Sequence, residues 1–125
     1  MELRAEVPGV RRVLIVVDMQ NDFVAEDGAL SSPAAREIVP FVCQRVERAL
    51  QTGDEVVFTL DTHLEDDAQF AQFPPHCLKG SWGQELIPEL QELISDQAAG
   101  LVYFVEKNRY SAFYRTGLEE YLGLT

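Results

Sequence analysis

The chain has 125 residues, of which 46% are hydrophobic, and this composition is typical of one globular domain. The formal net charge of −11 argues against nucleic-acid and anionic-membrane binding, because both need basic surfaces. Two cysteines, Cys43 and Cys77, are too few for a disulfide framework. The N-terminus lacks the apolar core of a signal peptide and no apolar run is long enough to span a bilayer, so we expect a cytoplasmic protein.

Three apolar runs predict the strands of the fold. Residues 13–17 form a continuous β-branched run, which is typical of a parallel strand covered on both faces. Residues 55–60 and 101–105 predict two more buried strands. Helical patterns separate the strands and follow the last one, where Thr116 and Glu119 have the spacing of a capping box. This order predicts an α/β protein with a parallel sheet.

The helical pattern between the first two strands has two possible starts. Ser32 can cap a helix, and Pro33 suits its first position. Pro40, however, would remove a hydrogen bond from the interior of a helix that began there. The helix therefore either kinks at Pro40 or begins near Ile38 with Pro40 in its first turn, and we favour the later start. Gly53 is expected to end it.

Both histidines of the chain lie in one segment after the second predicted strand. Asp61 and His63 are two residues apart, so they project to the same side of an extended segment, and a loop can bring His76 back beside them. One carboxylate and two imidazoles form a plausible ligand set for zinc, iron or manganese. The plainer alternative is a loop histidine that is hydrogen-bonded without a metal.

Charged residues also follow the other two strands, at the edge where open α/β sheets bind ligands. Asp18 follows the first strand and is either a catalytic group or a residue that starts a turn. Lys107 follows the third strand, and beside carboxylates and a metal it could bind a developing negative charge. Because parallel strands end at one edge of a sheet, we expect both residues to lie close to the metal-ligand candidates.

Four blocks of sequence occur in an order that is similar to that of a known family. They are VVDMQNDF at residues 16–23, DTH at 61–63, FPPHCLKG at 73–80 and KNRYSAF at 107–113. Together they resemble the nicotinamidases of the isochorismatase-like cysteine hydrolases, and the likeness covers nearly the whole chain. The metal-ligand pattern favours nicotinamidases over isochorismatases proper, which lack that site. The resemblance implies that residues 1–125 are the N-terminal portion of such a domain, with an incomplete Rossmann-like parallel sheet of about three strands.

The resemblance also implies a role for single residues: the base Asp18, the catalytic Lys107, the metal ligands Asp61, His63 and His76, and the ring-flanking aromatics Phe23 and Phe73. The family hydrolyses nicotinamide to nicotinate and ammonia through a cysteine acyl-enzyme. A divalent metal, most often zinc and otherwise iron or manganese, holds the pyridine nitrogen and bound waters. The implied substrate is the small molecule nicotinamide, and a homo-oligomer is expected.

The chain departs from the family pattern in two places. The loop between the histidines is short, so only Glu65, Asp66, Asp67 or water could complete the metal shell. The family's nucleophilic cysteine follows a fourth strand and lies beyond the last residue of this chain. Cys77 is expected to pack instead of replacing it, because neighbours in an extended segment face opposite sides and His76 would face the site. The argument for Cys77 as the nucleophile is that a nearby metal could lower the pKa of its thiol.

Two functions follow from this reasoning. The chain is either the N-terminal part of a nicotinamidase whose nucleophile lies outside it, or a truncated, inactive module that binds a metal and a pyridine ligand. A related hydrolase with another substrate is a third alternative. In the truncated cases the strand at residues 13–17 lacks a neighbour on one edge. The chain alone is then expected to be inactive and marginally stable, and to aggregate or to pair that edge with another polypeptide.

Overall fold

The computed structural model describes residues 10–95 and 101–124 and contains a three-stranded parallel sheet with the order β1-β2-β3. The strands are β1 (Val13–Val17), β2 (Glu55–Asp61) and β3 (Val102–Lys107). The pairing of β1 with β2 runs from Val13↔Glu55 to Val17↔Thr59, and that of β2 with β3 runs from Val56↔Val102 to Asp61↔Lys107. The parallel α/β fold is thus confirmed.

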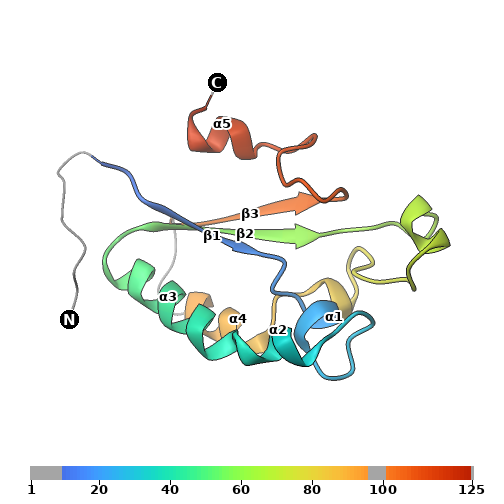
Figure 1. Cartoon of the computed structure of the whole chain (residues 1–125). Coiled ribbons are helices and arrows are strands. Elements are labelled where there is room, and N and C mark those ends of the chain that lie inside the picture. Colours follow the sequence, from blue (N-terminus) through green and yellow to red (C-terminus); the bar gives the residue numbers. More distant parts are fainter. Residues whose placement is uncertain (1–9, 96–100, 125) are drawn as a thin grey trace.

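Helices cover the two faces of the sheet unequally (Figure 1). One face carries α1 (Asn21–Val24), α2 (Pro33–Glu37), α3 (Val39–Gln51) and α4 (Pro88–Ser95), and the other carries α5 (Leu118–Leu122). The long connection between β2 and α4 contains the 3₁₀ turns η1 (Ala68–Ala71) and η2 (Trp82–Gln84). Within the described ranges, no helix is long and apolar enough to cross a membrane.

The break between α2 and α3 shows how the chain accommodates its two prolines. The Ser32 hydroxyl accepts a hydrogen bond from the Ala35 N–H at the start of α2. Ile38 then separates the two helices, and Pro40 lies in the first turn of α3, where its missing N–H costs nothing. Gly53 follows α3 with a φ of 81°, which glycine adopts without strain. The late helix start near Ile38 is confirmed.

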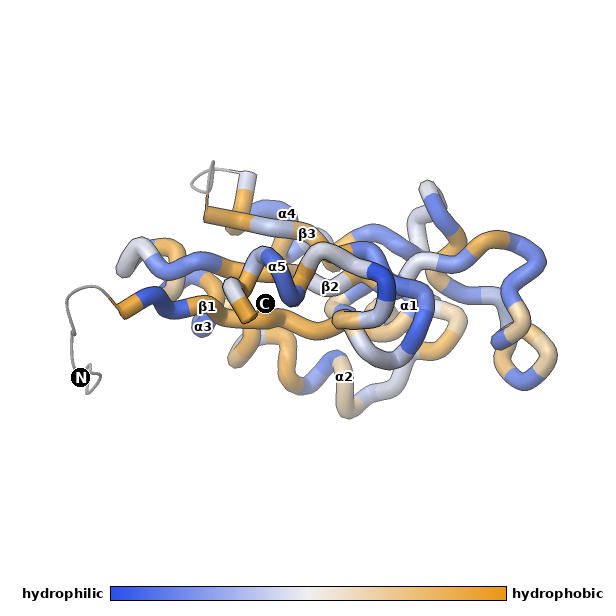
Figure 2. The backbone as a smooth tube through the Cα atoms, turned by 90° about the horizontal axis from the view of Figure 1, so that it is seen from above, coloured by the Kyte–Doolittle hydropathy of each residue, from blue (hydrophilic) through white to orange (hydrophobic). Residues whose placement is uncertain are grey.

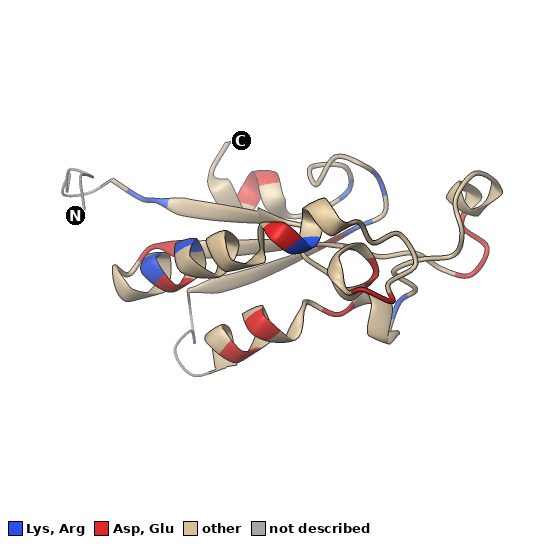
Figure 3. Ribbon diagram, turned by 60° about the horizontal axis from the view of Figure 1, so that its bottom comes forward, with Lys and Arg blue, Asp and Glu red and all other residues tan. Residues whose placement is uncertain are grey.

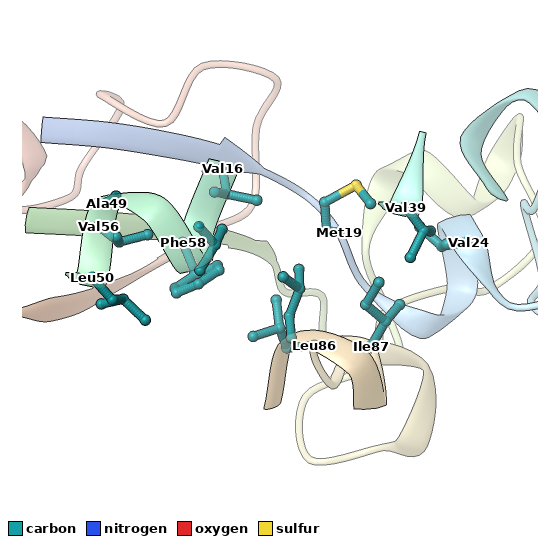
Figure 4. Packing of buried hydrophobic residues seen from close by; sticks show 12 residues of the cluster. Val16, Met19, Val24, Val39, Ala49, Leu50, Val56, Phe58, Leu86 and Ile87 are labelled. Carbon is teal, nitrogen blue, oxygen red and sulfur yellow. The ribbon is translucent and has the colours of Figure 1, made fainter. Parts of the chain in front are cut away.

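The main hydrophobic core lies between the sheet and the helices α1, α3 and α4 (Figure 4). Alternate residues of β2 face opposite sides, so Val56 and Phe58 enter this core while Val57 enters a smaller cluster beneath α5. That smaller cluster contains Val105 and Leu118. The larger core fixes β1, β2 and the segment that follows β1, and this segment carries site residues.

The face of β1 that points away from the main core is exposed, although the strand is hydrophobic along its length (Figure 2). Ile15 is 38% exposed and Val17 is 62% exposed. The prediction that β1 is covered on both faces is therefore wrong for the described residues. The reason is that the cluster beneath α5 centres on Val57 and Val105, which belong to β2 and β3, and includes only Val13 of β1.

The start of α5 also differs from the sequence pattern. Gly117, and not Thr116, is the N-cap residue. The Thr116 hydroxyl donates to the Ala112 carbonyl and accepts from the Leu118 N–H at 3.3 Å. Because the preceding loop already uses this hydroxyl, the predicted capping box does not form.

Candidate active site and metal centre

The three strands deliver charged residues to one edge of the sheet. Asp18 follows β1 directly, and the register pairs Asp61 at the end of β2 with Lys107 at the end of β3. The Lys107 ammonium lies 3.1 Å from Asp18 Oδ2 and 3.7 Å from Asp61 Oδ1, and its side chain is only 3% exposed. It also donates to the Arg109 carbonyl at 3.1 Å. The structure thus brings the expected acid and lysine into one ion-paired group, in which Lys107 is buried and Asp18 is partly exposed.

Thr59 orients the Asp18 carboxylate. Its hydroxyl donates to Asp18 Oδ1 at 2.7 Å, while the Asp18 N–H reaches the Thr59 hydroxyl and carbonyl at 3.1 and 3.2 Å. Asp18 itself has a φ of 57°, a conformation that non-glycine residues rarely adopt and that often marks functional positions. Sequence reasoning missed Thr59, although a buried hydroxyl two residues before Asp61, on the same side of β2, was a usable signal.

Asp61, His63 and His76 form a buried group whose ligand atoms all lie within 4.8 Å of one another. The distances from Asp61 Oδ2 are 2.8 Å to His63 Nε2 and 3.4 Å to His76 Nε2. On the outer side, His63 Nδ1 lies 2.7 Å from an Asp67 carboxylate oxygen, and His76 Nδ1 donates to the Pro74 carbonyl at 2.8 Å. Both rings are therefore held with Nε2 inward, as in proteins that bind a divalent metal through histidine. The residues present fit such an ion.

The acidic loop residues do not complete this group. Asp67 binds the back of His63 instead of facing Asp61, and Glu65 and Asp66 are exposed. Burial by itself raises the pKa of Asp67, but hydrogen bonds from the Gln69 N–H and from His63 outweigh it, so the pKa is lowered. Asp67 is thus held as a carboxylate that orients His63.

Gln20 fixes the backbone of Asp61. The fully buried Gln20 amide donates to the Asp61 carbonyl and accepts from the Asp61 N–H, both at 2.8 Å, and also donates to the Gln84 carbonyl. The segment after β1 is thereby bonded to the end of β2 and to the η2 turn. Sequence reasoning missed Gln20, because its partners are far away along the chain.

A hollow of about 250 Å³ opens onto the charged group. Its lining includes six of the seven predicted site residues together with three that were not predicted: Asp18, Phe23, Asp61, Phe73, His76 and Lys107, and Leu30, Gln69 and Tyr110. His63 does not line it and lies behind Asp61. The rings of Phe23 and Phe73 have centroids 5.8 and 6.2 Å from that of His76. An aromatic ring of a small ligand therefore finds both apolar walls and polar groups here.

Cys77 points away from this hollow. Its side chain is fully buried, and the sulfur contacts the Gly83 carbonyl at 3.7 Å. Burial raises the pKa of the thiol, and the carboxylates of Asp61, Asp22 and Asp18 raise it further. The backbone at Cys77 has a φ of 49°, so the residue is not extended, and the argument from strand alternation was wrong even though the thiol does face away.

Comparison with known proteins identifies the family of this chain. The family model of the Isochorismatase domain matches residues 12–123. The chain belongs to the isochorismatase family. A relative, the uncharacterized isochorismatase family protein PncA of Bacillus subtilis, is 37% identical over 115 residues, which cover 88% of this chain and 63% of that protein. A probable inactive nicotinamidase of Arabidopsis thaliana is 32% identical over 118 residues, which cover 87% of this chain and 58% of that protein.

Solved structures of the isochorismatase family share the fold. The crystal structure of nicotinamidase/pyrazinamidase PncA from Bacillus subtilis has a TM-score of 0.83 and 39% identity, covering 92% of this chain and 66% of that one. A pyrazinamidase of Pyrococcus horikoshii in complex with zinc has a TM-score of 0.76 and 29% identity, covering 91% and 64%. The chain thus spans less than two thirds of the length of these family members.

Proposed function

We propose that this chain is the part of a nicotinamidase-type amidohydrolase that supplies the base, the lysine and the metal site. One observation carries the proposal: the Asp18–Lys107 ion pair and the Asp61–His76 pair open into the same hollow. The aromatic residues Phe23 and Phe73, which line that hollow, support a flat heteroaromatic amide such as nicotinamide as the substrate. Nicotinamidases among the relatives and solved structures support the same substrate class.

We assign Asp61, His63 and His76 as the residues that hold the metal, and zinc as the metal. The donor set of one carboxylate and two imidazoles supports this, as does the zinc complex of the Pyrococcus relative. When bound, zinc supplies a Lewis acid that holds a pyridine nitrogen or water. Asp67 keeps His63 in the orientation that points Nε2 toward Asp61.

The remaining chemistry is assigned to Asp18, Lys107 and a cysteine that lies outside these 125 residues. Asp18 accepts the proton of the attacking thiol, and the thiolate adds to the amide carbon while the C=O π electrons move to the oxygen. Asp18 then gives the proton to the amide nitrogen as the C–N bond breaks and ammonia leaves, and water hydrolyses the resulting thioester to the carboxylate and the free thiol. Lys107 lies 3.1 Å from the Asp18 carboxylate and offers positive charge to the oxygen of the amide as it becomes negative. The burial and raised pKa of Cys77 support a nucleophile from elsewhere.

The test joins this chain to the part of the Bacillus subtilis relative that the chain does not span, and measures ammonia release from nicotinamide. We expect activity in the joined protein and none in the 125-residue chain alone. Asp18→Asn in the joined protein should lower turnover about a hundredfold to ten-thousandfold, because it removes the base. Asparagine tolerates the left-handed backbone at this position, so the fold should survive.

Asp66→Asn is the matched control, since Asp66 is exposed and does not line the hollow. Near-normal turnover in Asp18→Asn would reduce Asp18 to a turn residue. Hydrolysis by the chain alone would contradict the external nucleophile and make Cys77→Ala the next variant.

The alternative is a module that binds a metal and a pyridine without hydrolysis. The 32% identity to a probable inactive nicotinamidase supports this alternative. A joined protein that binds zinc and nicotinamide but releases no ammonia would favour this module over the enzyme.

A further inference from the structure

A second hollow lies beside the candidate active site, at the carboxyl end of β3. Its volume is about 320 Å³, and we call it the basic hollow. Its lining includes Lys79, Glu106, Arg109, Tyr114 and Arg115. Lys107 lines both this hollow and the first one, so the two are neighbours. No role assigned so far uses the other side chains of the basic hollow.

The basic hollow is positive within a strongly acidic chain. The chain has ten Lys and Arg residues against 21 Asp and Glu, yet four of the ten line this hollow. Figure 3 shows Lys or Arg in the loop between β3 and α5, while Asp and Glu are spread over helices and other loops. Lys79 faces Glu106 at 3.9 Å, where both side chains are more than half exposed and the attraction is weak. Among the described residues, no carboxylate lies within 4.0 Å of Arg109 or Arg115 as an ion pair, although the charge of Arg109 is one of the smaller causes of the lowered pKa of Asp67.

The guanidinium groups of Arg109 and Arg115 lie against one aromatic ring. Their central carbons are 5.4 and 5.6 Å from the centroid of Tyr114. Arg109 also donates to the carbonyl and side-chain oxygens of Asn108, which restricts its position. Two like charges held near one ring repel each other, and a bound anion relieves that repulsion.

The backbone at Arg115 adopts an unusual conformation. Its φ is 54°, and among the described non-glycine residues only Asp18 and Cys77 also have a positive φ. Such conformations cost energy and gather at ligand sites, as Asp18 illustrates at the first hollow. The turn at Arg115 holds its guanidinium beside Tyr114.

We propose that the basic hollow binds an aromatic carboxylate. Arginine matches the two oxygens of a carboxylate with a forked pair of donors, and its flat guanidinium packs against aromatic rings. The volume is at the lower end of the range for small-molecule sites. The choice of pyridine-3-carboxylate within this class rests on the proposed function, because hydrolysis converts a neutral amide into this anion in the neighbouring hollow. The basic hollow takes up the anionic product and not the neutral substrate.

The test is a calorimetric titration of the 125-residue chain with pyridine-3-carboxylate and, separately, with the neutral pyridine-3-carboxamide. We expect the carboxylate to bind at least about tenfold more tightly, with an affinity that falls as salt is added. Arg115→Asn should lower the carboxylate affinity at least about tenfold, because it removes the charge while asparagine tolerates the left-handed backbone. Arg109→Gln should also lower the carboxylate affinity at least about tenfold. Because Arg109 lies outside the helices and strands, this variant alters none of them.

Arg45→Asn is the matched control, because the Arg45 guanidinium also lies against an aromatic ring, 5.8 Å from the centroid of Phe41, on α3 and outside the basic hollow. Equal affinities for the carboxylate and the carboxamide would overturn the proposal. An equal loss in Arg45→Asn, or equally tight binding of inorganic phosphate, would do so too.

His76→Ala separates this proposal from the proposed function. Carboxylate binding that survives the loss of this metal ligand supports the basic hollow, whereas binding lost in His76→Ala places the anion in the first hollow and overturns it. A joined protein that fails to hydrolyse nicotinamide leaves the titration unchanged, so the two proposals fail separately.

Discussion

Asp67 lies behind His63 and shows how a side chain outside the hollow can control a metal site. Its carboxylate is 2.7 Å from His63 Nδ1 and also accepts from the Gln69 N–H. We expect Asp67→Asn to weaken zinc binding about 10- to 100-fold, because the ring loses the charged partner that orients Nε2. Competition between the chain and a zinc-binding dye measures this, and the exposed Asp66 gives the control Asp66→Asn. Identical affinities in the two variants would show that Asp67 has no part in zinc binding.

At the same scale, the residues predicted from the sequence are those that follow a strand. Asp18 and Lys107 could be placed together because parallel strands end at one edge, and that argument needs no knowledge of the loops. Gln20 could not be predicted, because its role is a hydrogen bond to a residue 41 positions away. The place of Thr59 on β2 was a usable signal, but its bond to Asp18 also spans 41 positions. Their effect depends on atomic distances that a sequence pattern does not contain.

Among the elements, α5 is tied to the sheet by a group of side chains around Glu55 at the start of β2. Arg11 donates to both oxygens of Glu55 at 2.6 and 2.9 Å, and the Tyr121 hydroxyl of α5 donates to Oε1 at 2.5 Å. The Tyr121 ring stacks on that of Tyr103, with centroids 4.1 Å apart. These contacts join the amino-terminal ends of β2 and β3 to α5.

This group makes the stability of the fold depend on pH. Hydrogen bonds from Arg11 and Tyr121 lower the pKa of Glu55 to about 2 from its usual value of 4.5. The stabilisation is therefore present above the unfolded pKa and is lost as the pH falls from about 4.5 toward 2. We expect Glu55→Gln to lower the midpoint of thermal unfolding by a few degrees at neutral pH and to have little effect near pH 2. Glu120→Gln, at an exposed position on α5, is the control, and a pH-independent difference for Glu55→Gln would contradict the assignment.

The positions of the strands could be predicted, because an apolar pattern continues over several residues. The residue that caps a helix was harder to predict. The three apolar runs identify the strands to within two residues, because burial on a sheet requires continuous apolar sequence. The start of α5 was wrong because the Thr116 hydroxyl bonds to the preceding loop, a competition between local partners that spacing alone cannot resolve.

For the whole molecule, β1 and β3 are the two edge strands of the sheet, and the outer edge of β1 is unpaired among the described residues. The Asp18 N–H donates to the Thr59 carbonyl and the Glu55 N–H to the Arg12 carbonyl, so even-numbered residues of β1 bond to β2. The N–H groups of Ile15 and Val17 consequently face the free edge. We expect them to exchange with deuterium about a hundredfold faster than those of Leu14 and Val16, as measured by NMR.

Leu14 and Val16 are the internal controls in this measurement. If the N–H groups of Ile15 and Val17 exchange as slowly as those of Leu14 and Val16, another polypeptide pairs with β1. That outcome is expected if copies of the chain associate through this edge. The sequence pattern predicted the apolar character of β1 but not its exposure. Exposure depends on which elements cover the strand, and the cluster beneath α5 includes only Val13 of β1.

The burial of Cys77 has a consequence for chemical labelling. We expect thiol reagents to reach the half-buried Cys43 on α3 but not Cys77, whose side chain has no exposed surface. Burial raises the pKa of both thiols, so access decides between them. A Cys43→Ala chain is then inert to alkylation while it stays folded. If such a chain gains hydrolytic activity from an added segment, inactivation by iodoacetamide reports on a cysteine of that segment alone, and a fluorophore on Cys43 in the parent chain tracks assembly from a single position.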